Sequence, residues 1–321
     1  MTLMAPPHSH EKPPPFFSVI TPSFNQGAYI NDTIQSVLAQ NDPDFEHLIF
    51  DNCSTDRTPE ILAQHAHLRT VIAPDQGQSD ALNKGLRAAR GEIICWLNSD
   101  DQYPPGTFAA LRSAFAQPGC DVVFGDAEQV FFDGTEPSRH PAYFSNRLDL
   151  VRWWTSRVRL HQPAVFFRRQ IFDRVGPLRE DLHLAMDYEY WWRISEQFTF
   201  HKLDRVLAIQ QRQPESKTVK LWHRVYEERE QIFSPHYGKL KTHPLRLIFE
   251  RRSAMAKRYR DQAQSLALTD RRFALSRLLS SLAQNPLSII QPHTLGIFAR
   301  IIGGARVDRS LRHLYSKNIS V

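Results

Sequence analysis

The sequence is poor in cysteine and has no long apolar run, and both absences narrow the class of protein. Three cysteines in 321 residues, Cys53, Cys95 and Cys120, follow no spacing typical of a zinc site or a disulfide framework. A reducing, cytoplasmic location fits them best. No stretch approaches the roughly 18 consecutive apolar residues that a membrane-spanning helix needs. We therefore expect a globular protein that does not cross a membrane.

The N-terminal segment also lacks the apolar core of a signal peptide. "MTLMAPPHSHEKPPP" is rich in proline and has no helical or strand periodicity. We expect residues 1–15 to form a disordered leader.

The formal net charge of +6 is unevenly distributed along the chain. Residues 220–321 hold 19 Lys and Arg against 7 Asp and Glu, so the preceding part is acidic and the tail is basic. No nucleic-acid-binding motif accompanies the tail, so nucleic acid is not an expected partner. An anionic membrane surface is favoured instead, through peripheral contact of basic helices such as the one in residues 286–304. The alternative is that these helices pack back on the rest of the chain.

Short apolar runs alternate with helical spacing over the first 130 residues. Strands rich in Val, Ile and Phe are expected at 17–24, 46–52, 69–74, 92–98 and 121–132. Helical spacing is found at 29–40, 57–66, 78–89 and 104–116. This alternation predicts βαβ units and therefore an α/β fold with a Rossmann-like, mainly parallel central sheet flanked by helices.

Beyond residue 130 the regular alternation of strand and helix patterns ends. A further strand is expected at 161–168, within a mixed region that reaches residue 213. From 214 the pattern is helical and interrupted by prolines, with helices expected at 216–234, 245–267, 270–284 and 287–302. We expect residues 16–213 to form the sheet domain and residues 214–321 a basic helical C-terminal extension.

Polar residues lie where the expected strands end. Asn25, Asp51, Asp75 and Asp100 all fall at or just past such ends, which is where parallel sheets bind their ligands. Asp100 and Asp101 are adjacent, and like charges beside a buried strand repel one another unless something neutralises them. One of them could cap the helix that follows, but a cap needs only one carboxylate. The pair therefore indicates a bound cation or another ligand that neutralises it.

Four segments occur in order with helical spacers of similar length between them: "TPSFN" (21–25), "DNCSTD" (51–56), "PDQGQSDALNKG" (74–85) and "LNSDD" (97–101). Together they resemble family 2 of the glycosyltransferases, which are inverting nucleotide-sugar enzymes of the GT-A fold. A fifth segment, "AMDYEYWWR" (185–193), lies where that family has its catalytic acidic motif. The resemblance covers roughly residues 17–212 and implies that the sheet domain is a GT-A catalytic domain.

The resemblance implies a divalent metal, Mg²⁺ or Mn²⁺, at the acidic pair. Asp101 would be the metal ligand, and Asp100 would face the ribose or lie just beyond the metal's ligands. The commoner family form has an acid where this chain has Asn98. A carboxylate can hold an anionic diphosphate only through such a cation, which also stabilises the leaving diphosphate.

The resemblance also implies how the donor nucleotide is bound. Asp51 would accept a hydrogen bond from the N3–H group of uracil or thymine. The loop made by Thr21, Pro22, Phe24 and Asn25 would pack on the base. Asp51 could instead be a turn residue with a structural role.

Three residues of the third helix match family positions near the donor sugar and diphosphate. They are Asp80, Asn83 and Lys84. Lys84 could equally be a solvated lysine on the helix surface.

On the acceptor side, the resemblance makes Asp187 the catalytic base. Glu189 is its rival and points to a different face of the same helix. Asp187 could also be a structural residue at a helix N-terminus. His161, Gln162 and Trp191 would line the acceptor pocket, although a Trp in such a helix is more often a core residue.

The expected function is thus transfer of a sugar from a UDP- or dTDP-type donor to a hydroxyl of a glycan, lipid-linked or polysaccharide acceptor, in cell wall or envelope biosynthesis. A sugar-nucleotide nucleotidyltransferase is the alternative enzyme, but the loop after the first strand, "PSFNQGAYI", lacks the cation that it needs. A second alternative is a catalytically inactive scaffold of the GT-A fold. The intact acidic residues argue against it, because an inactive scaffold would not need them. A dehydrogenase is disfavoured because no G-x-G-x-x-G follows the first strand. We expect the protein in the cytoplasm, free or on the cytoplasmic face of the membrane.

Overall fold

The structure is a computed structural model that describes residues 13–131, 135–155, 157–212, 221–267, 270–286, 289 and 293–302. It divides into two compact units, one up to Tyr237 and one from Gly238 onward. Most of the expected leader, residues 1–12, and the end of the expected extension, residues 303–321, lie outside the described residues. So do residues 287–288 and 290–292 of the last expected helix, and residues 216–220 of the expected helix 216–234.

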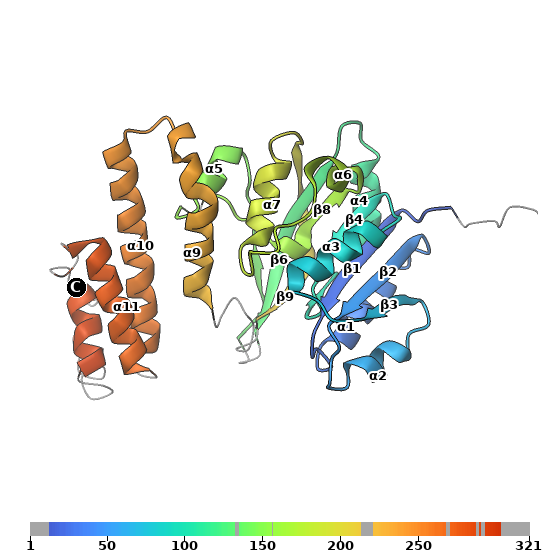
Figure 1. Cartoon of the computed structure of the whole chain (residues 1–321), viewed down its shortest axis with the longest axis horizontal. Coiled ribbons are helices and arrows are strands. Elements are labelled where there is room, and N and C mark those ends of the chain that lie inside the picture. Colours follow the sequence, from blue (N-terminus) through green and yellow to red (C-terminus); the bar gives the residue numbers. More distant parts are fainter. Residues whose placement is uncertain are drawn as a thin grey trace, which may run out of the picture. The chain divides into compact units, whose positions relative to one another are not determined.

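The first half of the sheet is parallel, as the strand–helix alternation predicts. It consists of β1 (Phe17–Ser23), β2 (Phe45–Asp51), β3 (Leu68–Ile72) and β4 (Ile93–Trp96), in the spatial order β3-β2-β1-β4 (Figure 1). The order changes direction between β1 and β4, which opens a crevice beyond the carboxyl ends of these strands.

Helices α1 (Ile30–Leu38), α2 (Thr58–Ala63), α3 (Gln78–Ala88) and α4 (Thr107–Phe115) connect or follow these strands. Helix α3 lies very close to β1 because residue 85 is glycine: a Cβ atom there would overlap the side chain of Ile20. On the sheet's other side, Phe17 of β1 stacks on Phe108 of α4, with ring centres 4.2 Å apart. The close packing of α3 brings its N-terminal residues to the crevice.

The second half of the sheet is mixed rather than parallel. It contains β5 (Asp101–Gln102), β6 (Val122–Phe131), β7 (Ser138–His140), β8 (Val165–Arg168) and β9 (Phe200–Arg212). Strand β8 runs antiparallel to both β4 and β6, whereas β9 runs parallel to β6. The short strand β5 pairs with β9, which places Asp101 opposite Gln210. The sequence predicts β6 and β8 but not β5, β7 or β9.

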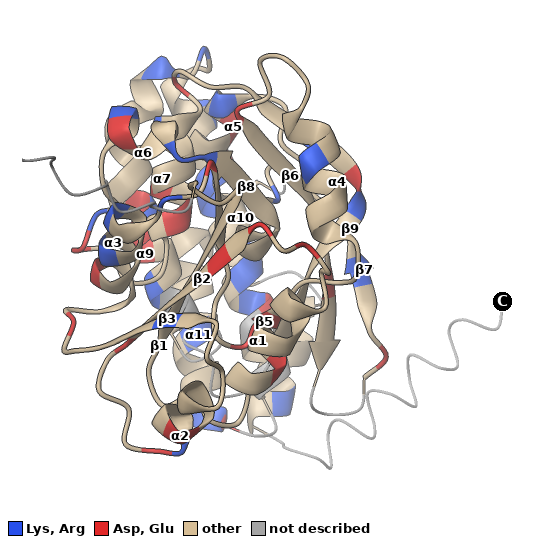
Figure 2. Cartoon of the chain, turned by 90° about the vertical axis from the view of Figure 1, so that its right-hand side faces the viewer, with Lys and Arg blue, Asp and Glu red and all other residues tan. Residues whose placement is uncertain are grey.

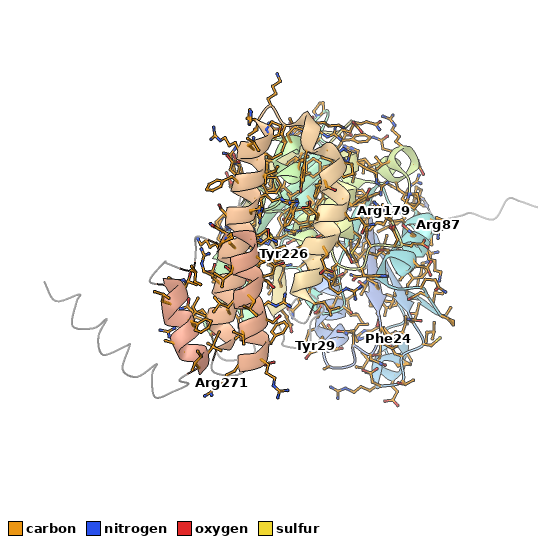
Figure 3. All side chains as sticks on the ribbon, turned by 60° about the vertical axis from the view of Figure 1, so that its left-hand side comes forward. Phe24, Tyr29, Arg87, Arg179, Tyr226 and Arg271 are labelled. Atoms are coloured by element: carbon orange, nitrogen blue, oxygen red, sulfur yellow. The ribbon has the colours of Figure 1, made fainter. Side chains whose placement is uncertain are left out.

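The described residues of the first unit also form the helices α5 (Arg147–Val151), α6 (Gln170–Val175), α7 (Met186–Ile194) and α9 (Trp222–Phe233). Trp191 of α7 is fully buried against Phe167 of β8. Tyr226 of α9, labelled in Figure 3, stacks on Trp153 with ring centres 5.7 Å apart. The first unit therefore contains α9, which lies beyond the expected domain boundary at residue 213.

The second unit contains α10 (Pro244–Leu266), α11 (Arg271–Gln284) and a helical segment at 293–302. Helices α10 and α11 lie side by side, and Figure 2 shows basic residues along α10. The small core of this unit consists of Ala263, Ala267, Ala274, Leu278, Ile297 and Ile301. Arg252 donates to the carbonyl oxygens of Ala283 and Gln284 in the last turn of α11. Among the described helices, none has the length and apolar character that crossing a bilayer requires.

Candidate active site

Asp51 lies at the crevice as the last residue of β2 and is 1% exposed. Its Oδ2 atom accepts hydrogen bonds from the hydroxyls of Ser23 (2.9 Å) and Ser54 (2.6 Å). Its Oδ1 atom accepts one from the backbone N–H of Ser54 at 2.8 Å. These are the bonds of a turn residue, and they also fix the carboxylate in place. Oδ1 keeps one acceptor position for a further donor.

The loop after β1 is tied to the loop after β2. Asn25 has a left-handed backbone, with φ of 52°, and its N–H donates to Ser54 Oγ at 2.7 Å. Its Oδ1 atom accepts from the backbone N–H of Thr55 at 2.9 Å. Phe24, labelled in Figure 3, is 55% exposed just beyond the end of β1. An exposed aromatic ring beside a fixed carboxylate is a surface on which a planar base could stack.

Thr21 and Pro22, which were expected in the same loop, lie instead inside β1. Thr21 is fully buried, and its hydroxyl oxygen is 3.0 Å from Nε2 of His47 on β2. Pro22 is also buried. These two residues support the strand and have no surface to offer a ligand.

The three expected donor-binding residues of α3 hold neighbouring segments together. Lys84 forms an ion pair with Asp80 (2.9 Å) and donates to the carbonyl oxygen of Pro74 (3.1 Å). Asp80 accepts from the backbone N–H of Gln76 at 2.9 Å. Asn83 is fully buried and exchanges two hydrogen bonds with the backbone of Leu178. The amide of Asn83 is thus engaged by the protein's own backbone, and Asp80 and Lys84 shape the loop at residues 74–77.

Asn98 is the centre of a hydrogen-bond network at the end of β4. Its Nδ2 atom donates to Asp101 Oδ2 (3.1 Å) and to Gln162 Oε1 (2.8 Å). Its Oδ1 atom accepts from Gln78 Nε2 (2.8 Å) and from the indole N–H of Trp96 (3.0 Å). This network fixes the side chain of Asp101, which is 5% exposed.

The described residues contain no group of three or more His, Cys, Asp or Glu side chains that could hold a metal ion by themselves. Asp101 and the partly exposed Asp100 are the carboxylates available at the end of β4. Mg²⁺ and Mn²⁺ are commonly held by one or two carboxylates together with substrate phosphates and water. The residues present therefore fit such a metal when it arrives with a diphosphate.

A cavity of about 390 Å³ begins at this network. Asn98 and Gln162 form part of its wall, and Gln162 (in the short 3₁₀ helix η1, Gln162–Ala164) is held by a bond from its Nε2 atom to the carbonyl oxygen of Trp96. Asp187 of α7 and Arg229 of α9 form another part of the wall. The cavity thus extends from Asn98, which is hydrogen-bonded to Asp101, to Asp187 of α7.

Asp187 and Glu189 have different surroundings. Asp187 lines the cavity and accepts from the backbone N–H of Tyr188 at 2.8 Å. Burial raises the pKa of Asp187 above its ordinary value, and the nearby Arg229 partly opposes this effect. Glu189 is 6% exposed and forms two hydrogen bonds with Arg193, at 2.8 and 2.9 Å. Of the two acids, only Asp187 faces the cavity.

Of the three expected acceptor-side residues, two line the cavity and one is buried in the core. His161 and Gln162 line the cavity, and burial lowers the pKa of His161 to about 4, so that its ring is neutral at neutral pH. Trp191 is fully buried among the rings of Trp96 and Phe167 and does not line the cavity. Trp191 is a core residue, which was the commoner fate expected of a Trp in a helix of this kind.

Two residues of α9 belong to the site and were not predicted. Glu228 accepts three hydrogen bonds from the backbone N–H groups of residues 183, 184 and 185, at 3.1, 2.8 and 2.9 Å. Arg229 lies over the ring of Tyr188, 4.0 Å from its centre. Nothing in "RVYEEREQ" separates these two residues from an ordinary charged helix surface, so the sequence carries no local signal for them.

The fold and the site define a Rossmann-like domain with ligand-facing acids at the ends of its strands. Residues 18–176 match the family model described as "Glycosyl transferase family 2". A PGL/p-HBAD biosynthesis glycosyltransferase of Mycobacterium tuberculosis is 31% identical over 183 residues, which are 55% of this chain and 68% of that protein. The chain belongs to glycosyltransferase family 2.

Three other proteins extend this result. The putative teichuronic acid biosynthesis glycosyltransferase TuaG of Bacillus subtilis is 35% identical over 126 residues, which cover 38% of this chain and half of that relative. TarS of Staphylococcus aureus, solved with UDP-GlcNAc, has a TM-score of 0.54 at 18% identity, covering 92% of this chain and 91% of that one. The mannosyltransferase PcManGT of Pyrobaculum calidifontis, solved with GDP-Man and Mn²⁺, has a TM-score of 0.51 at 18% identity, covering 90% and 85%. These structures share the GT-A fold with this chain.

Proposed function

We propose that this protein is an inverting, metal-dependent glycosyltransferase that moves a sugar from a UDP- or dTDP-type donor to a hydroxyl of a cell-envelope glycan or lipid-linked acceptor. One observation carries the proposal. Asp187 faces the same cavity as Asn98, and Asn98 is hydrogen-bonded to Asp101. The wall of this cavity thus contains the proposed general base and a residue that is hydrogen-bonded to the proposed metal-binding acid.

The donor's base would lie beyond β1 and β2. Asp51 has an acceptor position left on Oδ1, and the exposed ring of Phe24 provides a stacking surface. A pyrimidine with an N3–H group can donate to that carboxylate, whereas guanine and adenine have a different shape and donor pattern. The base-binding site therefore favours uridine or thymidine nucleotides.

The donor's diphosphate would lie at Asp101 and Asp100. Mg²⁺ or Mn²⁺, when bound there, would neutralise charge on the departing diphosphate. Asn98 orients Asp101 through the 3.1 Å hydrogen bond described above. Gln78 and Trp96 in turn orient Asn98, so the position of the acid is fixed before the donor arrives.

The acceptor hydroxyl would lie beside Asp187. A neutral hydroxyl is a poor nucleophile, and a carboxylate that takes its proton as the bond to the anomeric carbon forms is typically worth 10²- to 10⁴-fold in rate. The new bond forms on the face opposite the departing diphosphate, so the configuration inverts. The raised pKa of Asp187 makes it a stronger base than an ordinary carboxylate.

The relatives support the class of acceptor. TuaG and the mycobacterial enzyme are named for teichuronic acid and for PGL/p-HBAD biosynthesis. We extend cell-envelope glycan biosynthesis to this chain on that basis. The basic second unit suggests peripheral attachment to the cytoplasmic face of a membrane, where lipid-linked acceptors are found.

A thermal-shift series tests the donor and the metal together. UDP, dTDP, GDP and ADP are compared with Mn²⁺ and with EDTA, because a ligand that binds the native state raises the melting temperature by mass action. We expect UDP or dTDP to stabilise the protein in Mn²⁺ and not in EDTA. Asp101→Asn should abolish the effect of Mn²⁺, and Asp51→Asn should abolish the preference over GDP. Equal stabilisation by GDP would refute the base assignment, and full stabilisation in EDTA would refute the metal assignment.

A further inference from the structure

The charged side chains around the cavity are mostly cationic. Arg159 and Arg229 line it, together with three histidines, and Asp187 is the one carboxylate among the described lining residues. The two arginines and an ionised Asp187 together give the lining a formal charge of +1. A cavity that bound only a neutral sugar would have no use for this excess of positive charge.

Arg229 is poorly satisfied by the protein itself. Its guanidinium lies over the ring of Tyr188 and its charge acts on the nearby Asp187 carboxylate, but among the described residues it has no hydrogen bond or close ion pair. Its Nε atom is buried and has no partner within that part of the chain. A guanidinium has five N–H donors, and leaving them unmet inside a protein is costly. Such a group is suited to an anionic ligand, which it can bind through two hydrogen bonds.

Arg159 lies exposed at the same cavity. Its described side-chain hydrogen bond is a long one, 3.4 Å, from Nη1 to the carbonyl oxygen of Pro141. Its remaining donors are therefore available to a ligand. Unlike Lys, Arg presents a planar fork that matches a carboxylate or a phosphate.

The two arginines belong to the acceptor half of the molecule. The donor-binding strands form one side of the sheet, in the order β3-β2-β1-β4. Arg159 precedes η1, which leads into β8, and Arg229 is on α9 beside the segment that carries Asp187. The proposed diphosphate site is at Asp101, after β4. An anion held by Arg229 would therefore be part of the molecule whose hydroxyl Asp187 activates.

We propose that the acceptor carries a negatively charged group, a carboxylate or a phosphate, and that Arg229 and Arg159 select for it. This inference rests on the proposed function, because it takes Asp187 as the base and the cavity as the acceptor site. The charged group of the acceptor lies against α9 while its hydroxyl lies at Asp187.

Binding measurements with matched probes test the proposal. Methyl glucoside, methyl glucuronide and the 6-phosphate of methyl glucoside differ only at C6, which is neutral, a carboxylate or a phosphate. Their dissociation constants are measured by calorimetry with UDP and Mg²⁺ present, at constant ionic strength. We expect at least one acidic probe to bind about tenfold more tightly than methyl glucoside, a difference of about 1.4 kcal/mol. The tighter of the two acidic probes identifies the anion.

Variants connect this preference to the arginines. Arg229→Gln should abolish it, Arg159→Gln should reduce it, and Arg229→Lys should retain part of it while preserving the charge. Arg224→Gln is the matched control, because Arg224 is exposed on the same helix and does not line the cavity. The affinity for UDP should be unchanged in all four variants, and their melting temperatures report whether they fold.

Several outcomes would overturn the inference. Equal binding of all three probes, or no binding of the acidic ones at tens of millimolar, contradicts an anionic acceptor. If Arg229→Gln weakened UDP binding and left probe binding unchanged, the arginine would serve the donor instead. Failure of the proposed function would look different, because wild-type protein would then bind no nucleotide in the presence of Mg²⁺.

Discussion

At the scale of single residues, the assignment of the base can be tested most directly. Asp187→Asn should keep UDP and metal affinity and lose about 10²- to 10⁴-fold in turnover, because the amide cannot accept the acceptor's proton. Glu189→Gln should keep turnover and lower the melting temperature, because it breaks the ion pair with Arg193. Kinetics and calorimetry on both variants measure this. If the glutamate variant lost turnover while the aspartate variant kept it, the two roles would be exchanged.

The pH dependence of turnover follows from the same carboxylate. Burial raises the pKa of Asp187, and only its ionised form can act as a base. Turnover should therefore fall as the pH decreases. The midpoint of this fall, the acidic limb of the pH profile, should lie at a higher pH than an ordinary aspartate would give. Arg229→Gln removes a charge that lowers this pKa, so the acidic limb should move to higher pH. A limb that stayed in place or moved to lower pH would show that Arg229 does not act on Asp187.

Stability should also depend on pH, through a residue outside the site. His47 is fully buried on β2, and burial together with the nearby His67 and His65 lowers its pKa to about 3, against 6.5 when exposed. Between these values the unfolded chain binds a proton that the native chain does not. The free energy of unfolding should then decrease by about 1.4 kcal/mol per pH unit from this residue as the pH falls below 6.5.

Urea denaturation between pH 7.5 and 4.5 measures this slope. His47→Gln should be less stable than the wild type at pH 7.5 but should show a shallower dependence on pH. An unchanged slope in the variant would mean that other groups account for the acid sensitivity.

The sequence predicts where the acids of the site lie better than it predicts what they contact. Asp51, Asp101 and Asp187 were each expected at the end of a strand or the start of a helix, because short apolar runs define those ends. Their partners come from distant segments, such as Gln162 for Asn98. Burial likewise depends on tertiary packing. The sequence could therefore suggest Asn83 as a donor-binding residue but could not show that its side chain is buried and hydrogen-bonded within the protein.

At the scale of elements, the dependence on tertiary contacts explains why β1–β4 are predicted from the sequence and β9 is not. Strands β1, β2 and β4 are predicted because their apolar runs are buried on both faces and are nearly uninterrupted. The exposed edge strand β3 is predicted from its β-branched residues alone. Strand β9, "FHKLDRVLAIQQR", has charged residues along its exposed part and is ordered by its pairing with β6 and β5. Such pairing cannot be read from local periodicity. Helix α9 is predicted as a helix, but its membership of the first unit depends on contacts such as that of Tyr226 with Trp153.

The role of α9 can be tested through Glu228. Its carboxylate binds the three backbone N–H groups that precede Asp187, so it fixes the start of α7. Glu228→Ala should cost about 1–3 kcal/mol of stability by leaving buried donors unpaired. It should also lower kcat while leaving UDP affinity unchanged. Glu227→Ala is the control, because Glu227 is exposed on the same helix. A loss of stability without a loss of kcat would make Glu228 purely structural.

At the scale of the whole molecule, the second unit presents apolar side chains to its surface as well as to its core. Its core contains three alanines with Leu278, Ile297 and Ile301, whereas Leu245, Ile248 and Phe249 at the start of α10 are exposed. Arg246 and Arg251 lie in the same stretch. Apolar side chains beside arginines are typical of helices that lie in a membrane interface, where the arginines contact anionic head groups.

Co-sedimentation with liposomes tests this attachment. The full chain should bind vesicles containing phosphatidylserine or phosphatidylglycerol, should not bind vesicles of phosphatidylcholine alone, and should be released as the salt concentration rises. Leu245→Ser combined with Phe249→Ser should weaken binding to the vesicles. The double substitution should not lower the melting temperature, because the two residues are 71% and 67% exposed. Leu279→Ser, at an exposed position of α11, is the matched control. Absence of binding to either kind of vesicle would favour the alternative, in which the basic helices pack on the protein itself and the acceptor is reached without a membrane.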